Sequence, residues 1–366
     1  MSIIGFISID AEGWYDSQPV IRAEIMSSTP PLIRFAHPMA VQSFLRHIGA
    51  PADRFLQHND LPAHCDQPDV FVPVLRVWEF FDEAARKEDH LLGWDAGKHV
   101  GDHSLNRSLL RKLERAPTLL KALQRLSELI RSEGSDVDIG VFERREDILL
   151  YTHYWDLANR PGYHISQAYQ LAVFLDLIRF FLGDQWMPDE IGLEAGVIPS
   201  GLGNRLPGTR ILLNQPFGYV AIARKLLHHA ACHRISQGTG NEGQVTVRSF
   251  GYVDKFRSVA RAYLSEGYVS EQHVACLMDT SVRTMKRRLA AMDISYRALI
   301  DEVRFDVARE NLRNSDMRII DVARSAGFRD QANFTRMFCR IAGITPGRYR
   351  KIDLCEEPAT GPQATH

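Results

Sequence analysis

Two short segments near the C-terminal end of the chain carry basic and amide side chains at helical spacing. One face of each segment gathers them: Arg283, Lys286 and Arg287 in the first, and Gln331, Asn333, Arg336 and Arg340 in the second. A guanidinium can bind both acceptors of guanine in the major groove, and Asn or Gln can pair with adenine in the same way. These residue types at this spacing predict two faces that contact double-stranded DNA.

Each face belongs to the second helix of a helix-turn-helix pattern. Residues 273–278 form a short apolar helix, residues 279–281 interrupt it, and a second helix begins at Val282. The arrangement recurs 48 residues later, so that Ala323 takes the place of Ala275 where two helices press together. The sequence therefore predicts a duplicated motif at about 270–291 and 318–341, which is typical of DNA-binding proteins.

Periodicity also assigns the inward side of both second helices. Apolar residues recur there at helical spacing: Val282, Met285 and Leu289 in the first, and Phe334, Phe338 and Ile341 in the second. Between the motifs, Ser295 is a candidate N-cap, and apolar residues then follow at helical spacing up to Val307. We expect one connecting helix over 295–314, about 30 Å long. That length approaches one turn of DNA, about 34 Å, so the two second helices could enter successive major grooves.

These motifs resemble the DNA-binding domain of the AraC/XylS family of bacterial transcription regulators. Six stretches carry the resemblance, namely residues 281–289, 308–312, 319–323, 327–328, 334–338 and 343–350. The resemblance implies two helix-turn-helix motifs joined by a long helix, promoter or operator DNA as partner, and contact with RNA polymerase.

Charge is distributed unevenly along the 366 residues, a length that suits two or three domains. Residues 251–351 hold 19 Lys and Arg against 12 Asp and Glu, whereas the whole chain has a net charge of −1. The remainder is thus acidic, and we expect only the C-terminal part to meet a polyanion.

We expect the chain before the linker to form an α+β domain and the chain after it to form an all-α domain. Helical patterns fill 38–133 and 165–182, and a β-hairpin is expected at 137–143 and 148–155, with short strands near 190–197, 210–214 and 219–222. We divide the chain into five parts: an irregular lead-in (1–31), an effector-sensing and dimerisation domain (32–235), a flexible glycine-rich linker (236–250), the DNA-binding domain (251–351) and a tail (352–366).

The segments 188–193 and 213–217 resemble the arabinose-binding-like domain of one branch of the same family. This resemblance implies effector sensing and dimerisation, and it transfers neither arabinose as the ligand nor any pocket residue. Together the features predict a homodimeric, DNA-binding transcription regulator, an activator switched by a small-molecule effector.

Cysteine usage and the N-terminus favour a cytoplasmic protein. The five cysteines form no CxxC, the N-terminus lacks a basic start, and Asp176 and Arg179 interrupt the apolar stretch 171–182, so we expect no disulfide framework, signal peptide or membrane span. We interpret the cluster of His228, His229, Cys232 and His233 as a helix end and expect no metal and no cofactor.

Two alternatives to an effector-controlled regulator remain. One is a DNA-targeted enzyme, such as an alkylation-repair methyl acceptor, which requires a reactive cysteine. Cys65 lies between His64 and Asp66 and the other cysteines do not cluster, so we favour a protein that is not an enzyme. The other alternative is an effector-independent dimeric DNA-binding protein.

Overall fold

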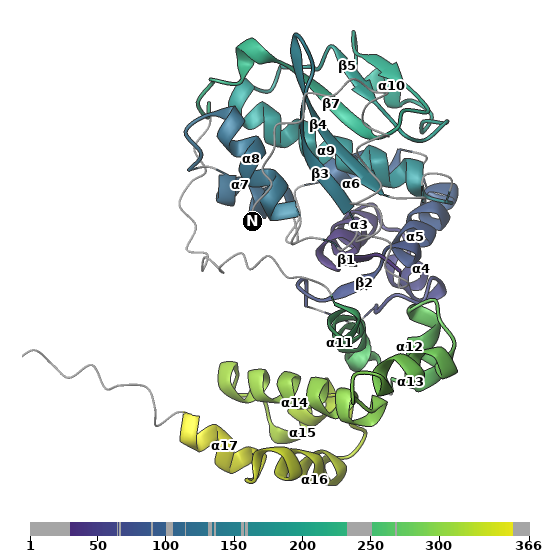
Figure 1. The fold of residues 1–366 in the computed structure, drawn as a ribbon, viewed down its shortest axis with the longest axis vertical. Helices are drawn as coiled ribbons and strands as arrows, with labels where there is room; N and C mark the ends of the chain where they lie inside the picture. Colours follow the sequence, from purple (N-terminus) through teal and green to yellow (C-terminus); the bar gives the residue numbers. More distant parts are fainter. Residues whose placement is uncertain are drawn as a thin grey trace, which may run out of the picture. The chain divides into compact units, whose positions relative to one another are not determined.

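The chain forms two compact units in a computed structural model (Figure 1), which describes residues 30–63, 65, 67–88, 91–99, 105–113, 115–130, 134, 137–154, 157, 160–232, 251–267 and 269–353. The N-terminal unit comprises Met1–Leu61 and Gln67–Phe250, and the C-terminal unit comprises Gly251–His366 with the short segment Pro62–Asp66. Most of the expected lead-in, the linker 236–250 and nearly all of the tail lie outside the described residues.

The N-terminal unit is built on a five-stranded sheet whose strand order is β3-β4-β7-β5-β6. The strands are β3 (Val137–Glu143), β4 (Asp147–Tyr154), β5 (Glu190–Gly192), β6 (Arg210–Leu212) and β7 (Gly218–Ala223). β5 and β6 run parallel, and the other neighbours are antiparallel. The predicted hairpin is present as β3 and β4, in a register that pairs Val137 with Tyr154.

Nine helical segments accompany this sheet among the described residues: α3 (Ala36–His47), α4 (Ala52–His58), α5 (Val74–Lys87), α6 (Leu92–Lys98), α7 (Leu105–Leu113), α8 (Leu119–Ile130), α9 (Tyr163–Leu182), α10 (Leu202–Arg205) and the 3-10 turn Arg224–Leu226. α6 packs closely on α9 because it offers glycine at the contact. A Cβ on Gly93 would lie 2.1 Å from the Ile165 carbonyl oxygen, so no larger residue fits there.

Helix α9 is the one described helix that is long and apolar enough to cross a membrane. It is 20 residues long, whereas the stretch 171–182 considered by itself is too short. In this structure 78% of its apolar window is buried inside the protein, which is how the core helix of a folded domain is placed.

The expectation of a purely helical region over 38–133 is wrong at one place. Residues Phe71–Pro73 form strand β2, which pairs antiparallel with β1 (Leu32–Arg34). Pro73 keeps an extended backbone and has no amide hydrogen to donate, so the strand ends there and α5 begins at Val74. The apolar period of α5 extends back over β2, which hides the strand in the sequence.

All secondary-structure elements described in the C-terminal unit are helical, and they include both expected motifs. Its elements are α11 (Tyr252–Tyr263), the 3-10 turn Leu264–Glu266, α12 (Glu271–Leu277), α13 (Val282–Ala290), α14 (Tyr296–Asn314), α15 (Ile319–Ser325), α16 (Gln331–Ala342) and α17 (Pro346–Asp353). The pairs α12–α13 and α15–α16 are the two helix-turn-helix motifs, and α14 joins them (Figure 1).

Side-chain caps set where four of these helices begin. Ser270, Ser281, Ser295 and Asp330 each accept a hydrogen bond from the backbone amide three residues further on. Each cap satisfies an amide that the helix cannot, which is worth about 1 kcal/mol. The expected cap at Ser295 is thus present, and both second helices begin at a cap.

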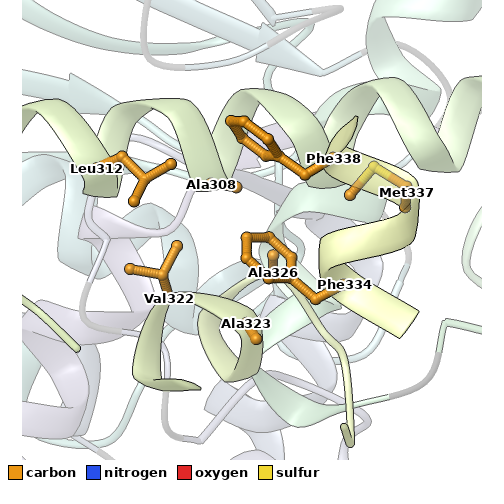
Figure 2. Close-up of a cluster of buried hydrophobic side chains, with 8 residues drawn as sticks. All are labelled: Ala308, Leu312, Val322, Ala323, Ala326, Phe334, Met337 and Phe338. Carbon is orange, nitrogen blue, oxygen red and sulfur yellow. The ribbon is translucent and has the colours of Figure 1, made fainter. Parts of the chain in front are cut away.

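The second motif encloses a cluster of buried apolar side chains (Figure 2). Its members come from α14, α15, the following turn and α16: Ala308, Leu312, Val322, Ala323, Ala326, Phe334, Met337 and Phe338. The inward assignment of Ile341 is wrong, because that side chain is 39% exposed. The inward row of α16 runs through Phe334, Phe338 and Ala342 at intervals of four, flanked by Met337, and it leaves Ile341 to one side.

Both turns need a residue with a left-handed backbone at the same place. Asp279 has a φ of 46° and Gly327, 48 residues later, has a φ of 75°. Only glycine adopts this conformation without steric cost. The second turn is also crowded, because a Cβ on Gly327 would lie 3.1 Å from a methyl carbon of Leu264 and 3.2 Å from the Gly267 carbonyl oxygen.

Replacing Gly327 with alanine is therefore expected to lower the free energy of unfolding of the C-terminal unit by about 1–2 kcal/mol. The matched control is Gly347→Ala, because Gly347 lies within α17 with open space around it. That change should instead stabilise the unit slightly, by about 0.5–1 kcal/mol. Urea unfolding followed by far-UV circular dichroism measures both, and equal effects of the two changes would contradict the assigned turn.

Candidate nucleic-acid interface

The outer face of α13 presents two arginines that have no ion-pair partner among the described residues. Arg283 and Arg287 are exposed, while Met285 and Leu289 on the opposite side are fully buried. Val282, the third expected inward residue, is partly buried. The helix thus turns its apolar side to the domain and holds two guanidinium groups in solvent.

Lys286 shares this outer face, but its ammonium contacts a neighbour. Its Nζ lies 2.7 Å from a carboxylate oxygen of Glu271 on α12. Both side chains are substantially exposed, and such pairs contribute about 0–1 kcal/mol. A phosphate group could therefore displace Glu271 at little cost.

The first turns of α16 hold an ordered polar chain. The side-chain amide of Asn333 donates to Asp330, and Arg336 donates to the Asn333 side-chain oxygen at 2.5 Å. Hydrogen bonding, first of all from the backbone amide of Asn333, lowers the pKa of Asp330 below its ordinary value. The resulting carboxylate fixes Asn333, and Asn333 in turn orients the guanidinium of Arg336. Gln331 is exposed beside them.

Arg340 differs from the other candidates because it contacts a poorly exposed carboxylate. Its guanidinium donates to Asp301 of α14, whose side chain is 12% exposed. Leaving Asp301 unpaired in that environment is costlier than breaking a pair in solvent. We therefore interpret Arg340 mainly as a residue that holds α16 against α14.

The long helix α14 is fixed to its neighbours along its length. Arg257 of α11 lies 2.7 Å from Glu302, and both guanidinium NH groups of Arg261 donate to Glu310. At its start, Tyr296 packs edge-on against Phe256 and donates to the Val269 carbonyl. With 19 residues, α14 is about 28 Å long, so the two second helices share a stiff support.

The structure shows the surroundings of several arginines that the sequence analysis did not select as candidates. Arg297 and Arg329 are exposed near the starts of α14 and α16, without an ion pair among the described side chains. Arg288, in contrast, lies over the Tyr252 ring at 5.4 Å, and Arg313 lies over the Tyr349 ring at 5.7 Å. Arg297 lies in the first turn of α14 after the Ser295 cap, and Arg329 directly precedes the Asp330 cap of α16. A position next to a predicted cap was the signal that could have singled out both.

The segment with His228, His229 and Cys232 hydrogen-bonds to backbone carbonyls, and His233 lies outside the described residues. Cys232 donates to the Phe181 carbonyl at 2.8 Å, and the His229 ring lies 3.0 Å from the Leu226 carbonyl oxygen. Within the described part of the chain, no group of three or more His, Cys, Asp or Glu residues is placed to hold a metal ion.

Two family models match the chain. The helix-turn-helix domain model matches residues 274–352, and the model of the arabinose-binding domain of the AraC transcription regulator, N-terminal, matches residues 49–228. The first match contains α13 and α16, and the second contains the whole five-stranded sheet.

Three curated relatives illustrate the similarity. The transcriptional activator NphR of a Rhodococcus species is 31% identical over 97 residues, which is 26% of this chain and 29% of NphR. The regulator ExsA of Pseudomonas aeruginosa is 47% identical over 58 residues, 16% of this chain and 21% of ExsA. The activator RhaR of Yersinia pseudotuberculosis is 35% identical over 79 residues, 22% of this chain and 27% of RhaR. The chain thus spans less than a third of the length of each of these relatives.

Proposed function

Because the chain belongs to the AraC/XylS family of transcription regulators, we propose that it binds promoter DNA sequence-specifically and activates transcription under the control of a small-molecule effector. The matched families and relatives are transcription regulators, not enzymes, so the alkylation-repair alternative is set aside. The observation that carries the proposal is the pair of capped helices, α13 and α16, which present basic outer faces from one stiff support.

We assign α13 and α16 to successive major grooves on one side of the DNA. Arg283, Arg287 and Arg336 are the proposed base readers, because their guanidinium groups are exposed and none is committed to a carboxylate of the described chain. Asn333 is a weaker candidate, since its side chain already bonds Asp330 and Arg336. Lys286 and Gln331 are proposed as further contacts, and Arg340 reaches DNA only if it releases Asp301.

The remaining assignments concern the N-terminal domain and the partners. The acidic part before the linker is repelled by DNA, so we propose that residues 32–235 dimerise and sense the effector while 251–351 bind DNA. Effector and DNA then bind with reciprocal coupling, because each shifts the same equilibrium. We further propose two half-sites per homodimer, RNA polymerase as a partner and a cytoplasmic location.

Replacing Arg283, Arg287 or Arg336 with alanine is expected to weaken specific DNA binding by about 1–3 kcal/mol and to relax the preference at one base position. Selection of binding sites from random DNA, followed by affinity measurements on the selected site, tests both effects. The matched control is Arg309→Ala, since Arg309 lies on α14 and pairs with Asp306 at 3.1 Å.

The control should keep the wild-type base preference. If all three test variants also kept it, α13 and α16 would not be the reading helices. If the folded protein bound no DNA even at low salt, the proposed function itself would be wrong.

A further inference from the structure

A cavity in the N-terminal unit lies between α9 and the sheet face that carries Thr152 and Tyr154. It opens to solvent on one side, and β1, α3, α7 and β3 complete its walls. Most of the lining is apolar, with Leu109, Val173 and Phe174 prominent. Six elements from three regions of the sequence thus contribute to one small space, as they do in ligand sites.

The lining has no charged group with which to bind an ion. Among the described lining residues, none is Asp, Glu, Lys or Arg, and the single titratable base is His37. Burial first, and the positive charge of Arg34 second, lower the pKa of His37 to about 3, so the ring is neutral at physiological pH. A carboxylate or an ammonium group would enter without a counterion and lose its hydration, which costs several kcal/mol.

Besides the neutral His37 ring and Tyr169, the hydrogen-bonding side chains of the lining come from β4 and the facing part of α9. The Thr152 hydroxyl lies 3.5 Å from the Gln170 side-chain oxygen, and Gln170 also hydrogen-bonds the buried Tyr154. Each polar group of a ligand left unpaired here costs about 1–3 kcal/mol. A sugar would have to pair several hydroxyl groups against a largely apolar lining, whereas one hydroxyl or amide can exchange hydrogen bonds with Gln170.

A second, smaller cavity adjoins the first and shares Thr152, Gln170 and Phe174 with it. Its further polar side chains are engaged elsewhere: the Gln167 side-chain oxygen accepts from the Ala195 amide at 3.1 Å, and the Tyr219 hydroxyl donates to Glu190 at 2.8 Å. The adjoining polar network is likewise internal, with the Tyr163 hydroxyl donating to the buried Glu194 at 2.7 Å. The pair Thr152–Gln170 is therefore the place where a ligand finds an adjustable hydrogen-bonding partner.

We propose that this cavity binds a small uncharged molecule with an apolar body and one hydrogen-bonding group, and that Gln170 contacts that group. Its role as the effector site rests on the proposed regulatory function, whereas the binding itself does not. The ligand class excludes pentoses, amino acids and carboxylates, in contrast to the ligand in the name of the matched N-terminal family.

Three probes of similar size and different charge separate the ligand classes in ¹⁹F NMR titrations of the full-length protein: neutral 4-fluorobenzyl alcohol, anionic 4-fluorobenzoate and cationic 4-fluorobenzylamine. We expect saturable binding of the alcohol, at least tenfold weaker binding of both ions, and no displacement of the alcohol by L-arabinose. Absence of alcohol binding at 10 mM probe, equal binding of an ion, or displacement by arabinose would each overturn the proposal.

Variants locate the site. Val173→Phe fills the cavity and should weaken binding of the alcohol at least tenfold, whereas Val197→Phe, at a side chain that is 61% exposed, should not change it. Gln170→Leu should weaken binding of the alcohol about 2–10-fold and leave binding of fluorobenzene unchanged. Equal behaviour of Val173→Phe and Val197→Phe, with unchanged circular dichroism, would place the probe elsewhere.

DNA binding is measured on the same samples by fluorescence anisotropy at low salt. If DNA binds and the alcohol does not, the cavity proposal fails by itself. If the alcohol binds and DNA does not, the regulatory function fails and the ligand site stands.

Discussion

Replacing Phe338 with alanine is expected to remove about 3–5 kcal/mol from the free energy of unfolding of the C-terminal unit. The ring is fully buried in the cluster of Figure 2, with ring centroids 4.9 Å from Phe305, 5.8 Å from Phe334 and 5.4 Å from Tyr349. Its removal leaves a cavity that three helices surround. Because domains are typically stable by only about 5–15 kcal/mol, this one change should bring the unit near its unfolding threshold.

The measurement can separate the two units because all five tryptophans occur before residue 187. Tryptophan fluorescence therefore reports the N-terminal unit, whereas far-UV circular dichroism in urea reports the helices of both. Phe338→Ala should lower the urea concentration at which part of the circular dichroism signal is lost, and it should leave the tryptophan transition unchanged. Ile341→Ala, on the same helix but 39% exposed, should change stability by no more than about 0.5 kcal/mol. A similar loss for both variants would show that the inward row of α16 is misassigned.

A steep loss of DNA affinity with salt is the second large effect. If about six cations neutralise phosphates, the affinity should fall on the order of 10³-fold between 50 and 200 mM salt, because bound counterions return to solution when the protein binds. Exposed arginines without an ion pair in the described chain supply such cations: Arg297, Arg329 and Arg348, besides the proposed base readers.

Two neighbouring arginines of α17 provide a matched comparison for this effect. Arg348 is exposed, so Arg348→Ala should reduce the slope of log affinity against log salt by about one, equally for every DNA sequence. The guanidinium of Arg350 instead donates to the Met317 carbonyl at 2.6 Å, so Arg350→Ala should lower stability and leave the slope nearly unchanged. A slope close to zero in wild-type protein would contradict electrostatic binding by this unit.

Local signals in the sequence were sufficient for the helices of the C-terminal unit. A serine or aspartate before an apolar period indicates both a cap and a direction, so the starts of α13, α14 and α16 could be predicted. Because the helix-turn-helix motif occurs twice, the same pattern of residues supported each prediction at two places. The left-handed turn position was visible only at Gly327, because an aspartate occupies it at 279.

Pairings between distant residues could not be read in this way. Periodicity indicates that α16 has an inward side, but the packing of α14 and α15 decides whether Met337 or Ile341 fills it. The same holds for the carboxylates: nothing in the sequence pairs Lys286 with Glu271 or Arg340 with Asp301. The cavity is the extreme case, since six separate elements contribute its lining.

The link between Arg340 and Asp301 also has a consequence for the spacing of the two DNA segments that α13 and α16 are proposed to contact. It ties α16 to the start of α14, which begins just after α13, so α16 cannot change its angle to α14 without breaking this bond. DNA turns by about a tenth of a revolution per base pair. A single inserted base pair between the DNA segments that α13 and α16 contact would therefore rotate one segment away from its helix. The number of base pairs between the two segments is then expected to affect binding, although no side chain contacts them.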